Sequence, residues 1–304
     1  MSDIVIKTEG LTKDYGKGRG IFGIDIEVHK GEVFGFVGTN GSGKTTTIRN
    51  MMGFIKPDQG TSTVNNLDSW KQSADIMKTV SYVPGEIAFP ALKSGTEFLK
   101  TQAQYLGVTD FTYMNHVIEL LQLDPSANLK RMSKGMKQKT AIVAALMGEK
   151  EILVLDEPTT GLDPLMREAF LNLIREEKQK GHTIFMSSHI FEEIEAVCDR
   201  VAMIKDGHII DTISLYDLRH PTTKNFVIEF QQPSKTQEFI KRSDFLVKPI
   251  NDTSCSLQCN ITQLDELFAS LKKYEITNFQ ESRRSLQQQF MSTYKEGLKK
   301  NEKK

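Results

Sequence analysis

Short apolar runs alternate with amphipathic stretches from Ile4 to about Ser214. In Ile24–Val28 apolar and acidic residues alternate, which is typical of a strand with one exposed face. Val33–Val37 and Ile152–Leu155 are apolar throughout, which indicates strands that are buried on both faces of a mainly parallel sheet. Because such strands alternate with helical stretches, the pattern predicts an α/β domain.

The pattern changes near Pro221, and we place a domain boundary there, with a first domain over residues 1–220 and a second over 221–304. The second domain is predicted to follow the order β-α-β-β-α-β before a final helix. Its predicted elements are strand Phe226–Phe230, helix Lys235–Lys241, strands Phe245–Ile250 and Ser256–Cys259, helix Leu264–Leu271 and strand Ile276–Phe279. That order is typical of a small ferredoxin-like α+β domain.

Composition favours a globular protein without affinity for nucleic acid. Hydrophobic residues make up 38% of the chain and charged residues 26%, as in ordinary folded domains. The 39 basic and 39 acidic residues cancel, so no overall basic field attracts nucleic acid. Apolar runs such as Ile142–Met147 are far shorter than the roughly 20 residues that span a bilayer. Any membrane role therefore has to come from a partner.

The three cysteines, Cys198, Cys255 and Cys259, are too few for a disulfide framework. This is typical of a reducing, cytosolic compartment. Cys255 and Cys259 are close enough in the sequence to clamp a metal, but no second Cys or His pair lies near them. Two ordinary, partly buried thiols are the favoured interpretation.

Residues 38–45 read GTNGSGKT and match the phosphate-loop pattern G-x-x-x-x-G-K-[ST]. Glycines allow backbone N–H groups to surround a triphosphate, and the following helix presents its N-terminus to the negative charge. A chance match is expected in about one chain in a hundred, and the position between a buried strand and a helix lowers that figure. We assign to nucleotide binding Gly38, Asn40, Gly41, Ser42, Gly43, Lys44, Thr45 and Thr46.

Three residues of this set have individual roles. Lys44 is expected to reach the β- and γ-phosphates and counts among the predicted catalytic residues, while the Thr45 hydroxyl is expected to ligate Mg²⁺. Thr46 is expected to contact the α-phosphate. ATP and Mg²⁺ are therefore the predicted ligands.

Two carboxylates, Asp156 and Glu157, end the apolar strand Ile152–Leu155. We predict that Asp156 holds Mg²⁺, directly or through water, and that Glu157 acts as the general base on the attacking water, which contributes about 10²–10⁴ in rate. A helix cap or a solvated loop would be the ordinary interpretation, but Pro158 and the phosphate loop favour the catalytic one. His189, after a third buried strand, is predicted to contact the γ-phosphate and the water.

Taken together, these motifs resemble the ATPase subunits of ABC transporters from about Ile4 to Ser214. Residues 132–138, MSKGMKQ, are similar to the ABC signature, and residues 161–163, GLD, resemble the D-loop. His189 resembles the switch histidine. Tyr15 resembles the aromatic residue that stacks on adenine, an interaction worth ~1–3 kcal/mol; taken alone, Tyr15 is equally well a surface tyrosine.

The resemblance implies a fold and an assembly. The fold is that of a phosphate-loop ABC cassette, with a RecA-like parallel sheet core, an antiparallel β subdomain and an α-helical signature subdomain. Ser133 and Gly135 would contact the γ-phosphate bound by an opposite subunit, and Asp163 of the D-loop counts among the expected nucleotide-binding residues. The expected partners are a second ATPase subunit, identical or closely related, and an integral membrane permease. The chain would then lie on the inner, cytoplasmic face of the membrane.

The sequence departs from the family pattern at two motifs. The signature is usually LSGGQ, but here Lys134 replaces a glycine and Met136 replaces the glutamine. Gly85 stands where family members usually carry a glutamine that ligates Mg²⁺; Glu86 or a water would have to substitute for it. This Pro-Gly-Glu form resembles ATPases that work with separately encoded export permeases, and it favours export.

The segment Phe89–Leu106 occupies the family's docking region for the membrane subunit. Its aromatic and aliphatic residues would line a groove for a short partner helix; ordinary core of the helical subdomain is the alternative.

A second function remains open, that of a soluble ABC ATPase acting on ribosomes or nucleic acid. Such proteins usually carry two cassettes or long coiled-coil insertions, and neither feature is present in this sequence.

Overall fold

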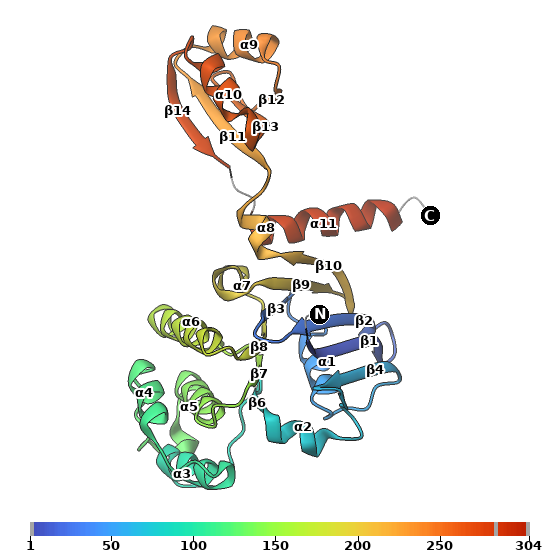
Figure 1. The fold of residues 1–304 in the computed structure, drawn as a ribbon, viewed down its shortest axis with the longest axis vertical. Helices are drawn as coiled ribbons and strands as arrows, with labels where there is room; N and C mark the ends of the chain where they lie inside the picture. The colour runs from blue at the N-terminus through green and yellow to red at the C-terminus, as the bar shows by residue number, and fades with distance from the viewer. Residues whose placement is uncertain (1–2, 283–284, 302–304) are drawn as a thin grey trace. The chain divides into compact units, whose positions relative to one another are not determined.

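The computed structural model describes residues 3–282 and 285–301 (Figure 1). The chain forms two compact units, one made of Met1–Leu215 with Phe290–Lys304 and the other of Tyr216–Gln289. The first break lies inside the short helix α8 (Leu215–Arg219), a few residues before the predicted boundary. The larger difference from the predicted division concerns the end of the chain, which belongs to the first unit.

The core of the first unit is a six-stranded sheet in the order β10-β9-β3-β8-β7-β6. Five strands run parallel, and β10 pairs antiparallel with β9. Every residue of β3, β7 and β8 is buried, as the continuous apolar runs predict. The prediction of a parallel α/β core is confirmed. The strands are β3 (Val33–Val37), β6 (Val80–Val83), β7 (Ile152–Asp156), β8 (Thr183–Ser188), β9 (Arg200–Lys205) and β10 (His208–Ser214).

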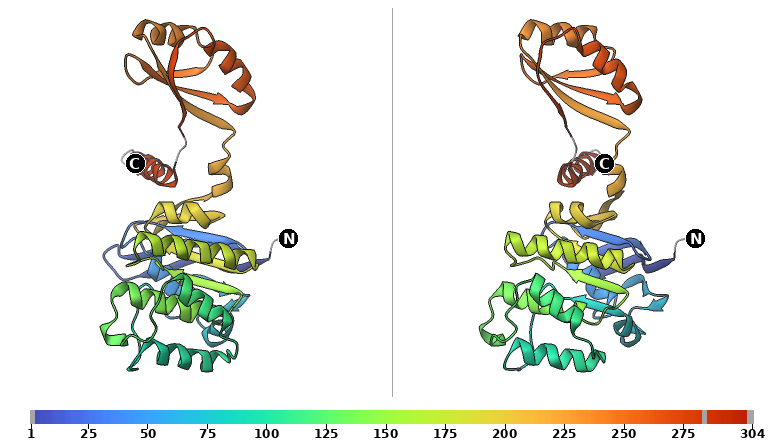
Figure 2. Two further views of the ribbon diagram at one scale, coloured as in Figure 1. Left: turned by 90° about the vertical axis from the view of Figure 1, so that its left-hand side faces the viewer. Right: turned by 60° about the vertical axis from the view of Figure 1, so that its left-hand side comes forward.

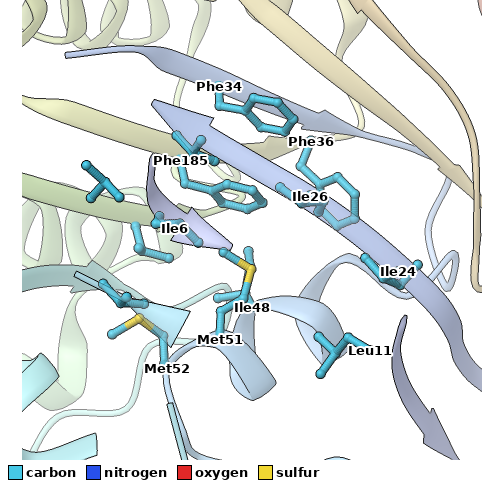
Figure 3. Packing of buried hydrophobic residues seen from close by; sticks show 14 of the residues in the cluster. Ile6, Leu11, Ile24, Ile26, Phe34, Phe36, Ile48, Met51, Met52 and Phe185 are labelled. Atoms are coloured by element: carbon cyan, nitrogen blue, oxygen red, sulfur yellow. The ribbon is translucent and has the colours of Figure 1, made fainter. Parts of the chain in front are cut away.

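A second, antiparallel sheet has the order β2-β1-β4-β5. Its strands are β1 (Ile4–Asp14), β2 (Gly20–His29), β4 (Gln59–Val64) and β5 (Leu67–Asp68). Burial alternates along β2, which confirms the predicted half-exposed strand. The shared core includes aromatic residues of the parallel sheet, aliphatic residues of β1 and β2, and residues of helix α1 (Lys44–Met51) (Figure 3). Each large side chain fully buried there contributes about 1.5–3 kcal/mol.

Helices α3 (Gly95–Leu106), α4 (Thr112–Leu120) and α5 (Lys134–Leu146) form the predicted helical subdomain beside strand β6 (Figures 1 and 2). The 3-10 turn Leu129–Arg131 leads into α5. The remaining helices of this unit are α2 (Ser73–Thr79), α6 (Pro164–Gln179) and α7 (Phe191–Val197).

The second unit contains an antiparallel sheet in the order β12-β13-β11-β14, with two helices and a 3-10 turn. Phe230, Phe239 and Tyr274 pack together in its core. The thiols of Cys255 and Cys259 lie in the same core, and burial raises the pKa of Cys255 to about 11. They are ordinary buried thiols. The elements are β11 (Thr223–Phe230), α9 (Pro233–Arg242), β12 (Leu246–Pro249), β13 (Ser254–Asn260), the turn Ile261–Gln263, α10 (Leu264–Leu271) and β14 (Ile276–Glu281).

The last helix, α11 (Leu286–Asn301), explains why the end of the chain belongs to the first unit. The buried ring of Phe290 packs edge-on against Phe191, with ring centroids 5.1 Å apart. The ammonium of Lys205 lies over the ring of Tyr294 at 4.9 Å. An amphipathic helix carries no sequence signal for the surface that it will cover, so the predicted range 221–304 for the second domain included it. Among the described residues, no helix is long and apolar enough to cross a membrane.

Candidate nucleotide-binding site

The phosphate loop connects strand β3 to helix α1 and depends on glycine at defined positions. Gly43, directly before α1, has a φ of 113°, a conformation that residues with a Cβ rarely adopt. A Cβ on Gly43 would lie 2.7 Å from Cγ2 of Ile21, and one on Gly38 would lie 2.3 Å from the carbonyl oxygen of Ile204. The loop can follow this path because neither residue has a side chain.

Lys44 is buried, with only 4% of its side chain exposed. Its ammonium donates to the carbonyl oxygens of Gly38 at 2.8 Å and Thr39 at 3.2 Å. It also lies 3.1 Å from Oε1 of Glu157. The loop thus holds the Lys44 ammonium at the N-terminus of α1. The free N–H groups and the dipole of this helix also favour an anion there.

A cavity of about 590 Å³ opens above the phosphate loop. Tyr15 lies at this cavity with about half of its surface exposed, so its ring is available for stacking. Seven other predicted residues share the cavity: Asn40, Gly41, Gly43, Lys44, Thr45, Thr46 and Glu157. The structure therefore brings the proposed adenine, phosphate and base positions into one site.

Five further lining residues were not among the predicted site residues. They are Gly18, Arg19, Gly20, Asp206 and Gly207. Two sequence signals could have indicated them. The glycine-rich segment after Tyr15 leaves room for a ligand, and the turn at Asp206-Gly207 ends a strand that neighbours β3. Arg19 adds a second cation to the cavity.

Asp156 ends strand β7 and is fully buried. Its Oδ1 accepts a hydrogen bond of 2.7 Å from the Ser187 hydroxyl, whereas its buried Oδ2 accepts none from the described part of the chain. Burial raises the pKa of Asp156, and the hydroxyls of Ser187 and Thr45 oppose this shift. A free carboxylate oxygen close to a threonine hydroxyl fits a Mg²⁺ site whose other ligands are water and phosphate.

Within residues 3–282 and 285–301, no three His, Cys, Asp or Glu side chains gather as a metal cluster. Asp156 and Thr45 are the residues that would hold a Mg²⁺ ion here. Gly85 lies beside this carboxylate, since a Cβ on it would be 3.1 Å from Oδ2 of Asp156. Glu86, the predicted substitute for the family's glutamine, does not line the nucleotide cavity.

Glu157 has a left-handed backbone, with a φ of 47°. Such a conformation costs about 1–3 kcal/mol in a residue other than glycine and concentrates at functional sites. The backbone N–H of Glu157 donates to the hydroxyl of Ser187 at 3.0 Å and to its carbonyl oxygen at 3.2 Å. Strand β8 thus fixes the turn that aims the Glu157 carboxylate at the phosphate loop.

His189 contacts the same carboxylate, with Nδ1 2.8 Å from Oε2 of Glu157. Burial by itself would raise the pKa of Glu157, but Lys44 and His189 outweigh it and hold that pKa below its ordinary value. Glu157 is therefore ionised at neutral pH, as a general base must be. The structure brings the three predicted catalytic residues into one hydrogen-bonded chain.

Ser133, Gly135 and Asp163 do not line the cavity. Ser133 caps helix α5 by accepting from the N–H of Met136 at 3.2 Å, and Asp163 caps helix α6 by accepting from the N–H of Met166 at 3.0 Å. Gly135 packs against the backbone of Gly161, so closely that a Cβ would lie 2.7 Å from the Gly161 carbonyl oxygen. The signature and the D-loop therefore contact each other, away from the chain's own nucleotide cavity.

Four other predicted residues, Gly38, Ser42, Asp156 and His189, also lie outside the cavity lining. His189 reaches the site through its contact with Glu157. Gly38 and Ser42 belong to the phosphate loop, and the buried Oγ of Ser42 has no hydrogen-bond partner among the described residues. Asp156 lies beneath the loop, next to Thr45.

Comparison with known proteins identifies the family of the chain. A model of the ABC transporter family matches residues 21–160. The bacitracin transport ATP-binding protein BcrA of Bacillus licheniformis is 36% identical over 230 residues, which is 75% of this chain and 74% of that protein. The linearmycin resistance ATP-binding protein LnrL of Bacillus subtilis strain 168 is 35% identical over 211 residues, 68% of each chain.

Solved structures agree on the fold. An ATP-binding subunit of an ABC transporter is 29% identical, covers 71% of this chain and 92% of its own, and superposes with a TM-score of 0.62. A dimeric cassette in a post-hydrolysis state, bound to ADP and Pi, is 20% identical, covers 69% and 98%, and has a TM-score of 0.61. At that identity the second similarity shows the shared fold alone.

Proposed function

The chain belongs to the ABC transporter family as an ATP-binding, ATP-hydrolysing subunit, and from this membership we propose that it powers export through a separate membrane permease. It would do so as one half of a dimer that closes around two ATP molecules. One observation supports the dimer: Lys44 and Glu157 line the nucleotide cavity and His189 contacts Glu157, whereas Ser133, Gly135 and Asp163 do not line the cavity. A second copy or a close relative would supply those residues to each cavity.

In the proposed reaction Lys44 leaves Glu157 to bind the β- and γ-phosphates. The freed carboxylate takes a proton from the attacking water, whose oxygen bonds to the γ-phosphorus while the bond to the β-phosphate oxygen breaks. His189 orients Glu157 and the water, and Thr45 and Asp156 would hold Mg²⁺. When bound, Mg²⁺ neutralises charge on the phosphates. Closure of the dimer would move the membrane subunits, and hydrolysis would reopen it.

Two observations support a membrane partner and export. The curated relatives include proteins named for bacitracin transport and linearmycin resistance. A cavity of about 360 Å³ lies between strand β6 and helices α3 and α5, with Tyr82, Phe89 and Phe98 in its lining. A short apolar helix of a permease would fit such a groove, and the chain would then lie on the cytoplasmic face of the membrane. These observations do not favour the ribosome or nucleic-acid alternative.

The variant Glu157→Gln tests the proposal. Because an amide cannot take the proton, we expect kcat for MgATP to fall by about 10²–10⁴ while ATP binding persists. The variant should accumulate ATP-bound dimers, detected by light scattering after size-exclusion chromatography. Glu168→Gln, an exposed carboxylate paired with Arg175 on helix α6, is the control and should retain wild-type turnover.

A second substitution tests dimer formation separately from ATP hydrolysis. Ser133→Arg in the Glu157→Gln background places bulk and charge at the signature, outside the chain's own cavity. We expect ATP binding to remain and the ATP-dependent dimer to disappear. Wild-type turnover in Glu157→Gln would disprove the assigned base, and a dimer that survives Ser133→Arg would disprove the shared site.

A further inference from the structure

Glu193 is a buried carboxylate that the proposed chemistry leaves unused. It lies in helix α7 and is 5% exposed. Its Oε2 accepts hydrogen bonds from the hydroxyls of Thr159 at 2.7 Å and Ser188 at 3.1 Å. Its Oε1 accepts none from the residues that the structure describes, and the guanidinium Nε of Arg167 lies 3.9 Å away.

The two hydroxyls belong to the segments that carry the proposed catalytic pair. Thr159 follows Glu157 by two residues, and Ser188 directly precedes His189. The Ser188 hydroxyl also accepts from the backbone N–H of Ile190 at 3.0 Å, so it holds the chain on both sides of His189. One carboxylate oxygen thus joins the turn after strand β7 to the turn after strand β8.

The energetics indicate that the Glu193 carboxylate is there to hold neighbouring segments in place rather than to form a stabilising ion pair. Burying an ionised carboxylate costs several kcal/mol, which a salt bridge repays only with close and well-oriented contacts. The Arg167 contact is long for that. Glu157, moreover, has a strained left-handed backbone, and such strain persists only where neighbouring contacts over-determine the conformation.

We propose that Glu193 is a positioning residue that keeps Glu157 and His189 within hydrogen-bonding distance. The inference rests on the proposed roles of those two residues. Without the Glu193 carboxylate, the segments bearing Thr159 and Ser188 lose their common acceptor, and the 2.8 Å contact between His189 and Glu157 loosens. Nucleotide binding, which depends on the phosphate loop and Tyr15, stays intact.

The test compares Glu193→Ala with Glu193→Gln in the full chain. We expect Glu193→Ala to lower kcat for MgATP by about 10–100-fold, since misplacement by about 1 Å costs on the order of 10²-fold. The Kd for ATP should change less than about twofold. The amide oxygen of Glu193→Gln can still accept from both hydroxyls, so this variant should recover most of the turnover.

Ser188→Ala and Thr159→Val remove the donors one at a time and should each lower kcat in part, which keeps the test available if Glu193→Ala does not fold. Glu32→Ala is the matched control. Glu32 is also buried and accepts from Arg200 and from the N–H of His29, but it lies at the amino end of strand β3. Its loss should lower the melting temperature and leave kcat unchanged.

A double-mutant cycle distinguishes positioning from general destabilisation. In the His189→Ala background, Glu193→Ala should lower kcat much less than in the wild type, because its target is already absent. Equal factors in both backgrounds, or a wild-type kcat in Glu193→Ala, would overturn the inference. If Glu157→Gln and His189→Ala themselves retain full turnover, the proposed catalytic roles fail instead.

Discussion

At the scale of single residues, the phosphate loop shows why glycine is required at particular positions. Gly41 and Gly43 both have a positive φ, 78° and 113°. Their surroundings differ, however. A Cβ on Gly41 would meet nothing within 4 Å, whereas a Cβ on Gly43 would lie 2.7 Å from the Ile21 side chain. Conformation and packing therefore both require glycine at position 43, whereas conformation alone requires it at position 41.

This difference predicts unequal effects of two alanine substitutions on the nucleotide-free protein. The left-handed backbone should lower the free energy of unfolding of both variants by roughly 1–2 kcal/mol. Gly43→Ala should lose about a further 1–3 kcal/mol, because the new methyl group has to displace Ile21. Urea denaturation without ATP measures both values, and equal losses would contradict the structural argument.

The residue types at the site could be predicted from the sequence, but their conformations could not. Lys44, Asp156, Glu157 and His189 lie at or after the carboxyl ends of buried parallel strands, and these ends meet at one edge of a sheet. The left-handed turn at Glu157 depends on Ser187, which is thirty residues away in the sequence. No local pattern encodes such a contact.

At the scale of elements, a buried cluster joins helix α4 of the helical subdomain to helix α6. Glu177 on α6 is completely buried and accepts hydrogen bonds from the Tyr113 hydroxyl, the Lys180 ammonium and the His182 ring. The Lys180 ammonium also lies 3.4 Å from the centre of the Tyr113 ring. Loss of the carboxylate would leave these groups without their shared acceptor.

The charge state of Glu177 makes this link depend on pH. Burial by itself raises the pKa of Glu177, but Lys180, Tyr113 and His182 together hold it below the ordinary value of 4.5. A folded-state pKa below the unfolded one stabilises the protein fully above about pH 4.5. That stabilisation disappears as the pH falls through the folded-state pKa.

Glu177→Gln should therefore lower the free energy of unfolding at pH 7 by about 3 kcal/mol. The difference from the wild type should shrink below pH 4.5. Denaturant unfolding at pH 7 and pH 4 measures both quantities. Glu176→Gln is the control, because its exposed pair with His116 joins the same two helices and should contribute at most about 1 kcal/mol. A pH-independent loss in Glu177→Gln would contradict the assignment.

The elements themselves followed from the sequence more closely than the contacts between them. Alternating or continuous apolar runs marked the strands β2, β3, β7 and β8, whose burial matches each pattern. The cluster around Glu177 had no such signal, because Tyr113 and Glu177 lie 64 positions apart. Amphipathic periodicity identifies the buried face of a helix, but it does not identify the partner.

At the scale of the whole molecule, the division into two compact units departs from the order of the sequence. The residues from Phe290 onward belong with Met1–Leu215, although a separate unit, Tyr216–Gln289, lies between them in the chain. Phe290 contacts the first residue of helix α7, two positions after His189. Helix α11 therefore packs against the start of helix α7, the helix that follows His189 in the chain.

Phe290→Ala should destabilise the first unit, although Phe290 lies beyond the second unit in the sequence. The Phe290 side chain is 3% exposed, and removing a buried phenylalanine ring typically costs about 3–5 kcal/mol. Calorimetry of the full chain should show a lower melting temperature for the transition that bound ATP stabilises, because ligand binding marks the first unit. The transition that does not respond to ATP should keep its midpoint. Met291→Ala, at an exposed neighbouring position on the same helix, should shift neither transition. A shift confined to the ATP-insensitive transition would instead make Phe290 part of the second unit's core, as a boundary drawn from the sequence alone would have it.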